Sequence, residues 1–292
     1  MDPLTRAFTL IFLTTTMAAI GLKVTSAELV SAFRDRSLMA RSLVVNLILV
    51  PLVGLLLVTI VPLSQDAKVG ILLLAVTPGG LNAIQFTSKT KDALCYAASL
   101  LFILTLLSVL LSPVIASFML PVSTSFSLRY ETIIRILFLG VLLPLLAGLG
   151  VHRVSKRVAQ ILSKPVAIIG TVFFVMVIVR LLAQRKQAMA TLSKTELAAM
   201  IGFILITMII GWLFGGPSIE TRRVLATATS MRNAALCFIM ATRGFPDTNV
   251  IVTVVAFSGL MIFPNMLFTV YELVKEKRRR TPVKKKVEDI RL

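Results

Sequence analysis

Long apolar runs make up most of this chain, and short polar or charged stretches separate them. Each run is close to the length that a helix needs to cross the hydrocarbon core of a bilayer, roughly 20 residues. A helix satisfies its backbone hydrogen bonds internally, which lipid demands of any spanning segment. The pattern therefore predicts an all-α polytopic membrane protein. Its nine expected spans lie at about residues 7–22, 38–62, 68–89, 93–120, 131–151, 163–183, 197–214, 221–243 and 248–274.

Two of these runs carry residues that interrupt a membrane helix. The third contains Pro78, Gly79 and Gly80, and a proline followed by glycines favours backbone that is not helical. The eighth contains Arg232, and a lipid-facing arginine costs roughly 2.5–3.5 kcal/mol on insertion scales. We therefore expect Arg232 to face a protein interior or a water-filled cavity. One interrupted helix in each half of a chain is typical of a secondary transporter.

Composition excludes a soluble domain of this size. The 292 residues are 57% hydrophobic and 15% charged, with a mean hydropathy of +0.93. Cys95 and Cys237 both fall in apolar runs, so we expect no disulfide framework, and no residues have the spacing of metal ligands. The single histidine, His152, is expected to be a solvated residue of a basic loop between spans. We predict no cofactor and no resident metal ion.

The net charge of +18 indicates topology rather than nucleic-acid binding. Much of it lies in a basic tail, residues 275–292, and in short loops between spans. Because lysine and arginine gather on the cytoplasmic side, their count places the C-terminus in the cytoplasm and the N-terminus outside. The first run lacks a small-residue cleavage pattern, so we take it as the first span of a transmembrane domain over residues 1–274. We expect an inner- or plasma-membrane protein whose tail contacts anionic lipid.

Five short motifs follow one another along the chain: Met17 with Gly21-Leu22, Asn46 with Pro51, Pro78-Gly79-Gly80, Met231-Arg232-Asn233 and Pro264-Asn265. In this order they resemble the bile acid:sodium symporter family. The resemblance implies an inverted-repeat transporter fold with a panel domain and a core domain, in which two broken helices cross near the bilayer midplane. On this basis the core comprises about residues 38–120 and 197–274, less a panel helix at the end of the chain. Residues 7–22 and part of 131–183 would form the panel.

The departures from this family concern its sodium sites. The resemblance places Ala228 and Arg232 where the family has a glutamate and a glutamine that bind sodium, and Asn46 at a further glutamine position. A sodium-binding Ser-Asn pair of the family aligns with Ala83 and Ile84, or with Asn82 and Ala83 in the neighbouring register. Neither crossing segment retains a carboxylate, and two positive charges about 4 Å apart repel by roughly 4 kcal/mol at an effective dielectric of 20. We therefore predict that the usual sodium sites are absent.

Arg232 allows two interpretations. As a tethered cation it would prop the crossing helices and attract an organic anion, because a planar guanidinium suits carboxylate or sulfonate. Alternatively it would only cap backbone carbonyls of the other broken helix, as intramembrane arginines commonly do.

The candidate site includes further residues besides Arg232. The candidate substrate-binding residues are Arg232, Asn233, Asn265, Thr77, Asn82, Gln85 and Thr15, and the crossover backbone comprises Pro78, Gly79, Gly80, Thr229 and Ser230. For Asn233 and Asn265 the alternative is a hydrogen bond between helices. For Thr15 it is a hydrogen bond to its own helix.

The sequence thus predicts a secondary transporter that moves a small organic anion by alternating access without sodium. Sodium coupling through backbone carbonyls, Asn82 and Asn46 is one alternative, proton coupling is another, and a non-transporting sensor or scaffold is a third. An enzyme is not expected, because the interior of the spans offers no nucleophile–base pair. The family's substrates range from steroid acids to small keto and hydroxy acids.

Overall fold

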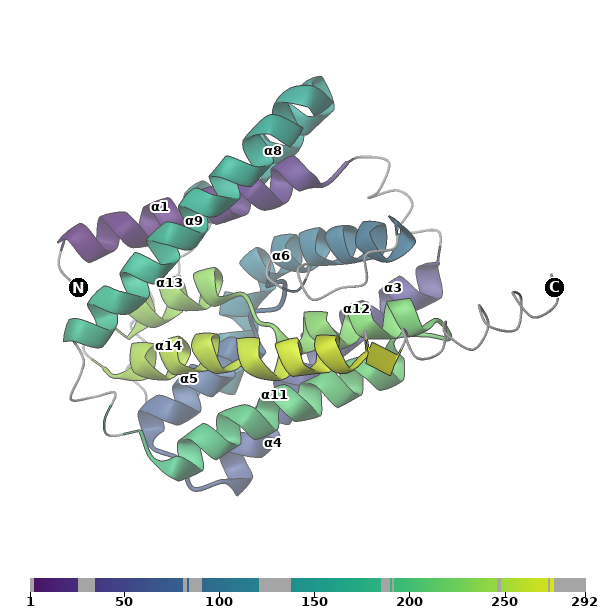
Figure 1. The fold of residues 1–292 in the computed structure, drawn as a ribbon. Helices are drawn as coiled ribbons and strands as arrows, with labels where there is room; N and C mark the ends of the chain where they lie inside the picture. Colours follow the sequence, from purple (N-terminus) through teal and green to yellow (C-terminus); the bar gives the residue numbers. More distant parts are fainter. Residues whose placement is uncertain are drawn as a thin grey trace.

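The computed structural model describes residues 3–25, 35–80, 83, 91–120, 138–184, 190, 192–245, 248–272 and 274–275. Over these residues all regular secondary structure is helical. The segments are α1 (Pro3–Lys23), α3 (Arg36–Val44), the π-helical η1 (Val45–Leu49), α4 (Val50–Ile60), α5 (Gln65–Ala75), α6 (Lys91–Met119), the π-helical η3 (Phe138–Leu142), α8 (Leu143–Val154), α9 (Lys156–Gln184), α11 (Lys194–Phe214), α12 (Ile219–Ser230), α13 (Ala234–Gly244) and α14 (Val250–Leu260) (Figure 1). A further helical stretch, 262–272, follows α14.

Seven helical segments among the described residues are long and apolar enough to cross a membrane. They are Pro3–Lys23, Arg36–Ile60, Ala93–Met119, Lys156–Arg180, Lys194–Phe214, Ile219–Gly244 and Val250–Glu272. The fifth predicted span is a shorter apolar helix, Phe138–Val154, and the third begins as α5 and then enters residues that are only partly described. These segments confirm a polytopic all-α membrane protein. The count of nine spans and the inverted repeat stay predictions.

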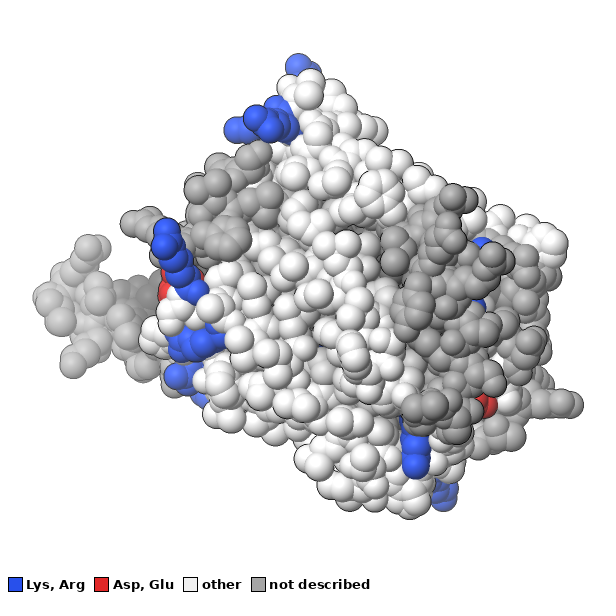
Figure 2. Space-filling model, turned by 180° about the vertical axis from the view of Figure 1, so that it is seen from behind, with Lys and Arg blue, Asp and Glu red and all other residues white. Residues whose placement is uncertain are grey.

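The outer surface suits lipid rather than water. Large apolar side chains are exposed on several helices, among them Phe118 at 84% and Ile60 at 70%. Soluble monomers rarely expose large contiguous apolar patches. Figure 2 shows a broad band of uncharged atoms with lysines and arginines toward its margins.

The helices pack in two groups. In the first, α1 lies along both α8 and α9, and the three run together across the upper part of Figure 1. In the second, α5 contacts α4, α13 and α14, and α11 packs along α12. The first group contains residues expected in the panel and the second contains residues expected in the core, although the division into domains stays a prediction.

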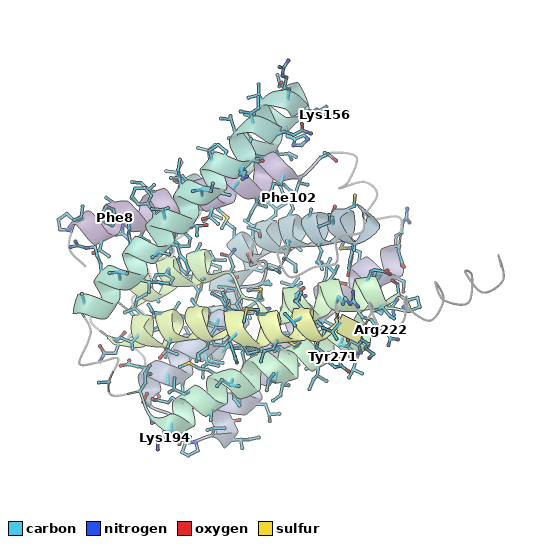
Figure 3. The ribbon with its side chains drawn as sticks, in the orientation of Figure 1. Phe8, Phe102, Lys156, Lys194, Arg222 and Tyr271 are labelled. Atoms are coloured by element: carbon cyan, nitrogen blue, oxygen red, sulfur yellow. The ribbon has the colours of Figure 1, made fainter. Side chains whose placement is uncertain are left out.

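The basic residues lie toward the two ends of the helices. Figure 3 shows Lys156, Arg222 and Tyr271 toward one end of the molecule and Phe8 and Lys194 toward the opposite end. Which end is cytoplasmic stays a prediction.

His152 corrects one expectation from the sequence. It is not a solvated loop residue: it lies in the last turn of α8, is only 7% exposed, and its Nδ1 is 2.5 Å from the carbonyl oxygen of Leu22 in α1. The apolar run ends at about residue 151, but the helix continues because its last turn packs against the end of α1. Hydropathy locates the edge of the membrane, whereas the helix ends where its packing ends.

Candidate functional site

The predicted interruption of the eighth span is present. Helix α12 ends at Ser230, residues Met231–Asn233 are not helical, and α13 begins at Ala234. Asn233 is the N-cap of α13, and its Oδ1 accepts a hydrogen bond from the backbone N–H of Leu236 at 3.1 Å. Asparagine is a favoured N-cap because its side chain satisfies one of the free N–H groups of the first turn. The second half of this broken helix therefore starts at the residue beside Arg232.

The third span is interrupted at its Pro-Gly-Gly motif. Helix α5 ends at Ala75, and residues 77–80 are not helical. Gly79 has a φ of +94°, a conformation that favours glycine, and a Cβ there would lie 2.7 Å from the Thr105 Oγ1. Residues 81–82 and 84–90 lie outside the described part of the chain, and with them the predicted site residues Asn82 and Gln85.

The two interruptions touch each other. The backbone N–H of Asn233 donates to the carbonyl oxygen of Thr77 at 2.8 Å. A Cβ on Gly80 would lie 2.7 Å from the carbonyl oxygen of Arg232, so only glycine permits this approach of the two backbones. The two predicted crossover segments thus form one continuous structure in the protein interior.

The guanidinium of Arg232 lies at the centre of this structure and is 1% exposed. Its Nε donates to the Leu74 carbonyl oxygen at 2.9 Å, and its Nη2 donates to the Ala75 carbonyl oxygen at 2.6 Å. Its Nη1 donates to the Asn46 Oδ1 and to the Thr229 carbonyl oxygen, both at 3.2 Å. All four acceptors are protein oxygens, and they come from η1, α5 and α12.

These acceptors belong to groups that need a positive partner. The last carbonyls of a helix have no donor within the helix, and the C-terminal end of the helix carries partial negative charge. Leu74 and Ala75 end α5, and Thr229 is the second-last residue of α12. Arg232 therefore neutralises the C-terminal ends of both half-helices at once. In this structure Arg232 thus caps backbone carbonyls, which is the second of the two interpretations given from the sequence.

Two side chains of α6 donate hydrogen bonds to carbonyl oxygens of the first interruption. The Oγ of Ser112 donates to the Val76 carbonyl oxygen at 2.5 Å, and the Oγ1 of Thr105 donates to the Gly79 carbonyl oxygen at 3.1 Å. Sequence reasoning missed both residues. Their spacing of seven, two helical turns on one face, was the available signal.

Other predicted polar residues form hydrogen bonds to protein groups. Asn46 lies buried in η1, where its Nδ2 donates to the Ser42 carbonyl oxygen at 3.0 Å. Asn265 is also buried: its Oδ1 accepts from the Oγ of Ser230 and its Nδ2 donates to the Met261 carbonyl oxygen, both at 2.8 Å.

The predicted threonines bond to nearby carbonyls. The Oγ1 of Thr15 donates to the Ile11 carbonyl oxygen of its own helix, and that of Thr77 donates to Leu73 of α5. The Oγ1 of Thr229 reaches across to the Thr207 carbonyl oxygen in α11. Ala83 and Ala228, the alanines predicted to occupy former sodium-site positions, are both buried.

A cavity of about 340 Å³ lies beside the two interruptions. Gly80, Arg232, Asn233 and the first residues of α13 border it on one side. On the other sides it is lined by Phe12, Thr16, Met17, Lys23, Ala167, Gly170, Thr171, Phe174, Val175, Ile178, Met261 and Ile262. Residues 14–16 are three consecutive threonines, and of these Thr16, rather than the predicted Thr15, lines the cavity.

Asn233 borders this cavity and has one donor that makes no hydrogen bond. Its side chain is almost fully buried at 3% exposure, and its Nδ2 has no hydrogen-bond partner. A buried polar group without a partner costs about 1–3 kcal/mol. Helix N-termini, such as that of α13, also attract anions. The donor, the helix end and the apolar walls together suit a ligand with an acceptor group and an apolar body.

A model of the Sodium Bile acid symporter family matches residues 10–192. The match covers more than half of the chain and includes the first interruption, while Arg232 lies beyond it. Among curated proteins no match was found. The chain belongs to the sodium bile acid symporter family.

Proposed function

We propose that the protein is a secondary transporter that moves an organic anion by alternating access and does not require sodium. Membership of the family supports transport of the bile acid symporter type. The cavity lies between the α1–α9 pair and the two helix interruptions, where a relative movement of the two helix groups would open it to either side.

The observation that carries sodium independence is the set of hydrogen bonds made by Arg232. A sodium ion would need several oxygen ligands, and the oxygens of Leu74, Ala75, Asn46 and Thr229 already accept from the guanidinium. A second cation about 4 Å away would meet a repulsion of roughly 4 kcal/mol at an effective dielectric of 20. Because the guanidinium is covalently attached, it holds the crossing helices together without being released to either side.

The substrate group is proposed to sit at Asn233 and the N-terminus of α13. The free Nδ2 of Asn233 donates one hydrogen bond to a carboxylate or sulfonate. The dipole of α13 and the nearby charge of Arg232 add electrostatic attraction. Arg232 itself acts at a distance, because its four hydrogen bonds go to protein oxygens. The aromatic and aliphatic walls hold the apolar body of the anion.

Counterflow into proteoliposomes tests this proposal. A panel of labelled organic anions, from a bile acid to a small 2-keto acid, is offered with sodium and then with lithium, potassium or choline in its place. We expect equal uptake of the accepted anion in all four salts. Uptake that collapses in choline contradicts sodium independence, and binding of an anion without any flux contradicts transport and favours a sensor.

Arg232→Lys and Asn233→Ala refine the test. Lysine keeps the charge but loses the planar set of donors, so uptake should fall while binding of the anion persists. Asn233→Ala should weaken anion binding about tenfold, which is about 1.4 kcal/mol. An Asn233→Ala variant that folds and binds the anion as tightly as the wild type contradicts the assigned substrate site.

A further inference from the structure

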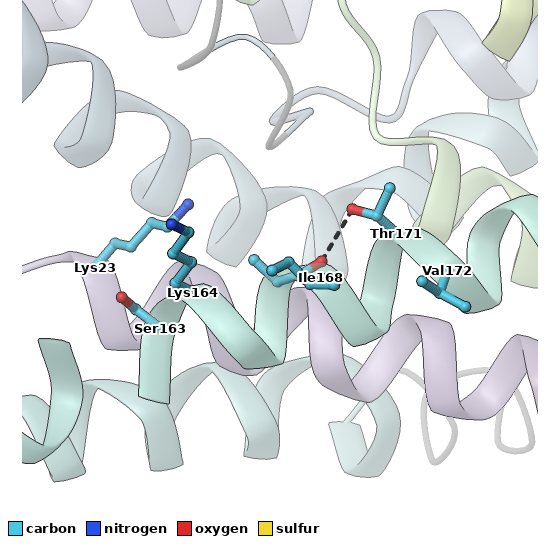
Figure 4. A pocket seen from close by; sticks show the side chains of 7 residues that line it. Lys23, Ser163, Lys164, Ile168, Thr171 and Val172 are labelled. Atoms are coloured by element: carbon cyan, nitrogen blue, oxygen red, sulfur yellow. Dashed lines mark hydrogen bonds between the residues drawn. The ribbon is translucent and has the colours of Figure 1, made fainter. Parts of the chain in front are cut away.

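A second pocket, of about 360 Å³, adjoins the cavity at the end of α1. It is lined by Lys23 of α1 and by residues of α9, namely Ser163, Lys164, Ala167, Ile168, Thr171 and Val172 (Figure 4). Lys23, Ala167 and Thr171 also line the cavity beside Asn233. The two spaces are therefore neighbours that share one wall, and Lys23 belongs to both.

Two ammonium groups face this pocket. Lys23 lies in the last turn of α1 and Lys164 lies near the start of α9, and in Figure 4 the two side chains converge from their separate helices. Both lysines are exposed, and no carboxylate of the described residues lines either space or forms an ion pair with them. Two close positive charges repel each other, and an anionic group between them removes that repulsion. Each ammonium offers up to three donors to such a group.

The part of α9 that lines the two spaces gives a scale for their combined length. Lys164 and Phe174 are ten residues apart on this helix, which is about 15 Å along its axis. The ring of Phe174 lies 6.2 Å from that of Phe238 in α13, one turn beyond the Asn233 cap. A molecule that extends from Asn233 to the lysine pair would therefore be on the order of 15 Å long.

We propose that Lys23 and Lys164 bind a second anionic group of the substrate, so that the protein prefers an elongated amphipathic dianion to the corresponding monoanion. This inference rests on the proposed function, because the first anionic group is the one assigned to Asn233. The apolar side chains of α1 and α9 between the two ends contact the body of the molecule. The second group is a carboxylate, sulfonate or sulfate.

Competition in proteoliposomes tests the inference. A labelled monoanion that the protein transports is displaced by α,ω-dicarboxylates of increasing length and by monocarboxylates of the same length. For the wild type we expect the best dicarboxylate to compete about tenfold better than its matched monocarboxylate. The Lys23→Gln, Lys164→Gln double variant should lower this ratio about tenfold. Lys156→Gln, an exposed lysine of α9 that lines neither space, serves as the control and should leave the ratio unchanged.

Three other outcomes would contradict the inference. A wild type that transports monoanions with no preference for dicarboxylates overturns this inference and leaves the proposed function standing. A wild type that binds no organic anion overturns both. If the double variant loses mono- and dicarboxylates equally, and the loss depends on the anionic lipid content of the vesicles, the lysines bind lipid headgroups and the inference is wrong.

Discussion

The two helix interruptions differ in what they bring to their contact. The first, at Pro78-Gly79-Gly80, has only small side chains. The residues that lead into it contribute the backbone carbonyl oxygens of Leu74, Ala75 and Thr77. The second contributes donors: the guanidinium of Arg232 and the backbone N–H of Asn233. The donors therefore lie on the second side and most of the acceptors on the first, and Arg232 also bonds to the Thr229 carbonyl oxygen of its own segment. In the proposed transporter, this one basic residue takes the place of an ion that would otherwise join the two segments.

The largest effect should follow from removing the donor side. In Arg232→Met the buried carbonyls of Ala75 and Thr229 lose their guanidinium donor, at about 1–3 kcal/mol for each group left without a partner. We expect the free energy of unfolding in detergent to fall by about 2–6 kcal/mol. Arg243→Met removes an exposed arginine at the end of α13 and should change it by no more than about 0.5 kcal/mol. Equal stability of the two variants would contradict the role given to Arg232.

Restoring acceptors to the second interruption should restore a need for sodium. The double variant Ala228→Glu, Arg232→Gln carries the residues that the family resemblance places at these positions. Sodium at 100 times its dissociation constant would stabilise this variant by about 2.7 kcal/mol. The wild type should melt at the same temperature in sodium and in choline. Stabilisation of the wild type by sodium would show that Arg232 does not replace the ion.

Separating the two backbones should have a smaller effect. A Cβ at Gly80 meets the Arg232 carbonyl oxygen at 2.7 Å, and we expect Gly80→Ala to cost about 1–3 kcal/mol of stability. Gly202 and Gly259 lie in helices with nothing within 4 Å of a new Cβ. Alanine at either position should be neutral or stabilise by up to about 1 kcal/mol. Thermal unfolding of the three variants measures this difference in stability. Equal destabilisation at Gly202 and Gly80 would contradict the role given to the close backbone approach.

The smallest effect concerns the support from α6. Ser112→Ala removes the hydroxyl that donates to Val76, and we expect a loss of about 1–2 kcal/mol. Ser117→Ala, in the same helix, removes only a hydrogen bond to the helix's own carbonyl at Val114 and should stay within about 0.5 kcal/mol. Chemical denaturation of both variants distinguishes the two cases. A Ser112→Ala variant as stable as Ser117→Ala would mean that the first interruption does not depend on α6.

The sequence predicted the positions of both interruptions because each carries residues that a lipid-facing helix excludes. A buried arginine and a Pro-Gly-Gly motif are costly at that depth whatever the surrounding fold. The direction of the guanidinium could not be predicted in the same way. Hydropathy gives the depth of Arg232 but not which carbonyls meet it, and those carbonyls lie about 157 residues away in the chain.

Other contacts could not be predicted from the sequence for related reasons. Serine and threonine in membrane helices often bond to their own helix, so the spacing of Thr105 and Ser112 places them on one face but does not show that they reach another segment. For Asn265, nearness to the substrate in the family and a hydrogen bond between helices were both open, and the second is the contact that the structure contains. Helix ends beyond the membrane edge, as at His152, depend on tertiary packing that hydropathy does not report.

The attachment of Arg232 to the chain has a thermodynamic consequence for the proposed transporter. A positive charge that stays attached to the protein does not cross the membrane down a concentration gradient. It therefore supplies no energy for transport of the anion. The direction of net flux would follow the voltage and the concentration of the anion alone. At a potential of 100 mV, negative inside, each negative charge favours the exit of the anion by about 2.3 kcal/mol. At equal concentrations on both sides, the proposed transporter would therefore release anions from a resting cell, and dianions more completely than monoanions.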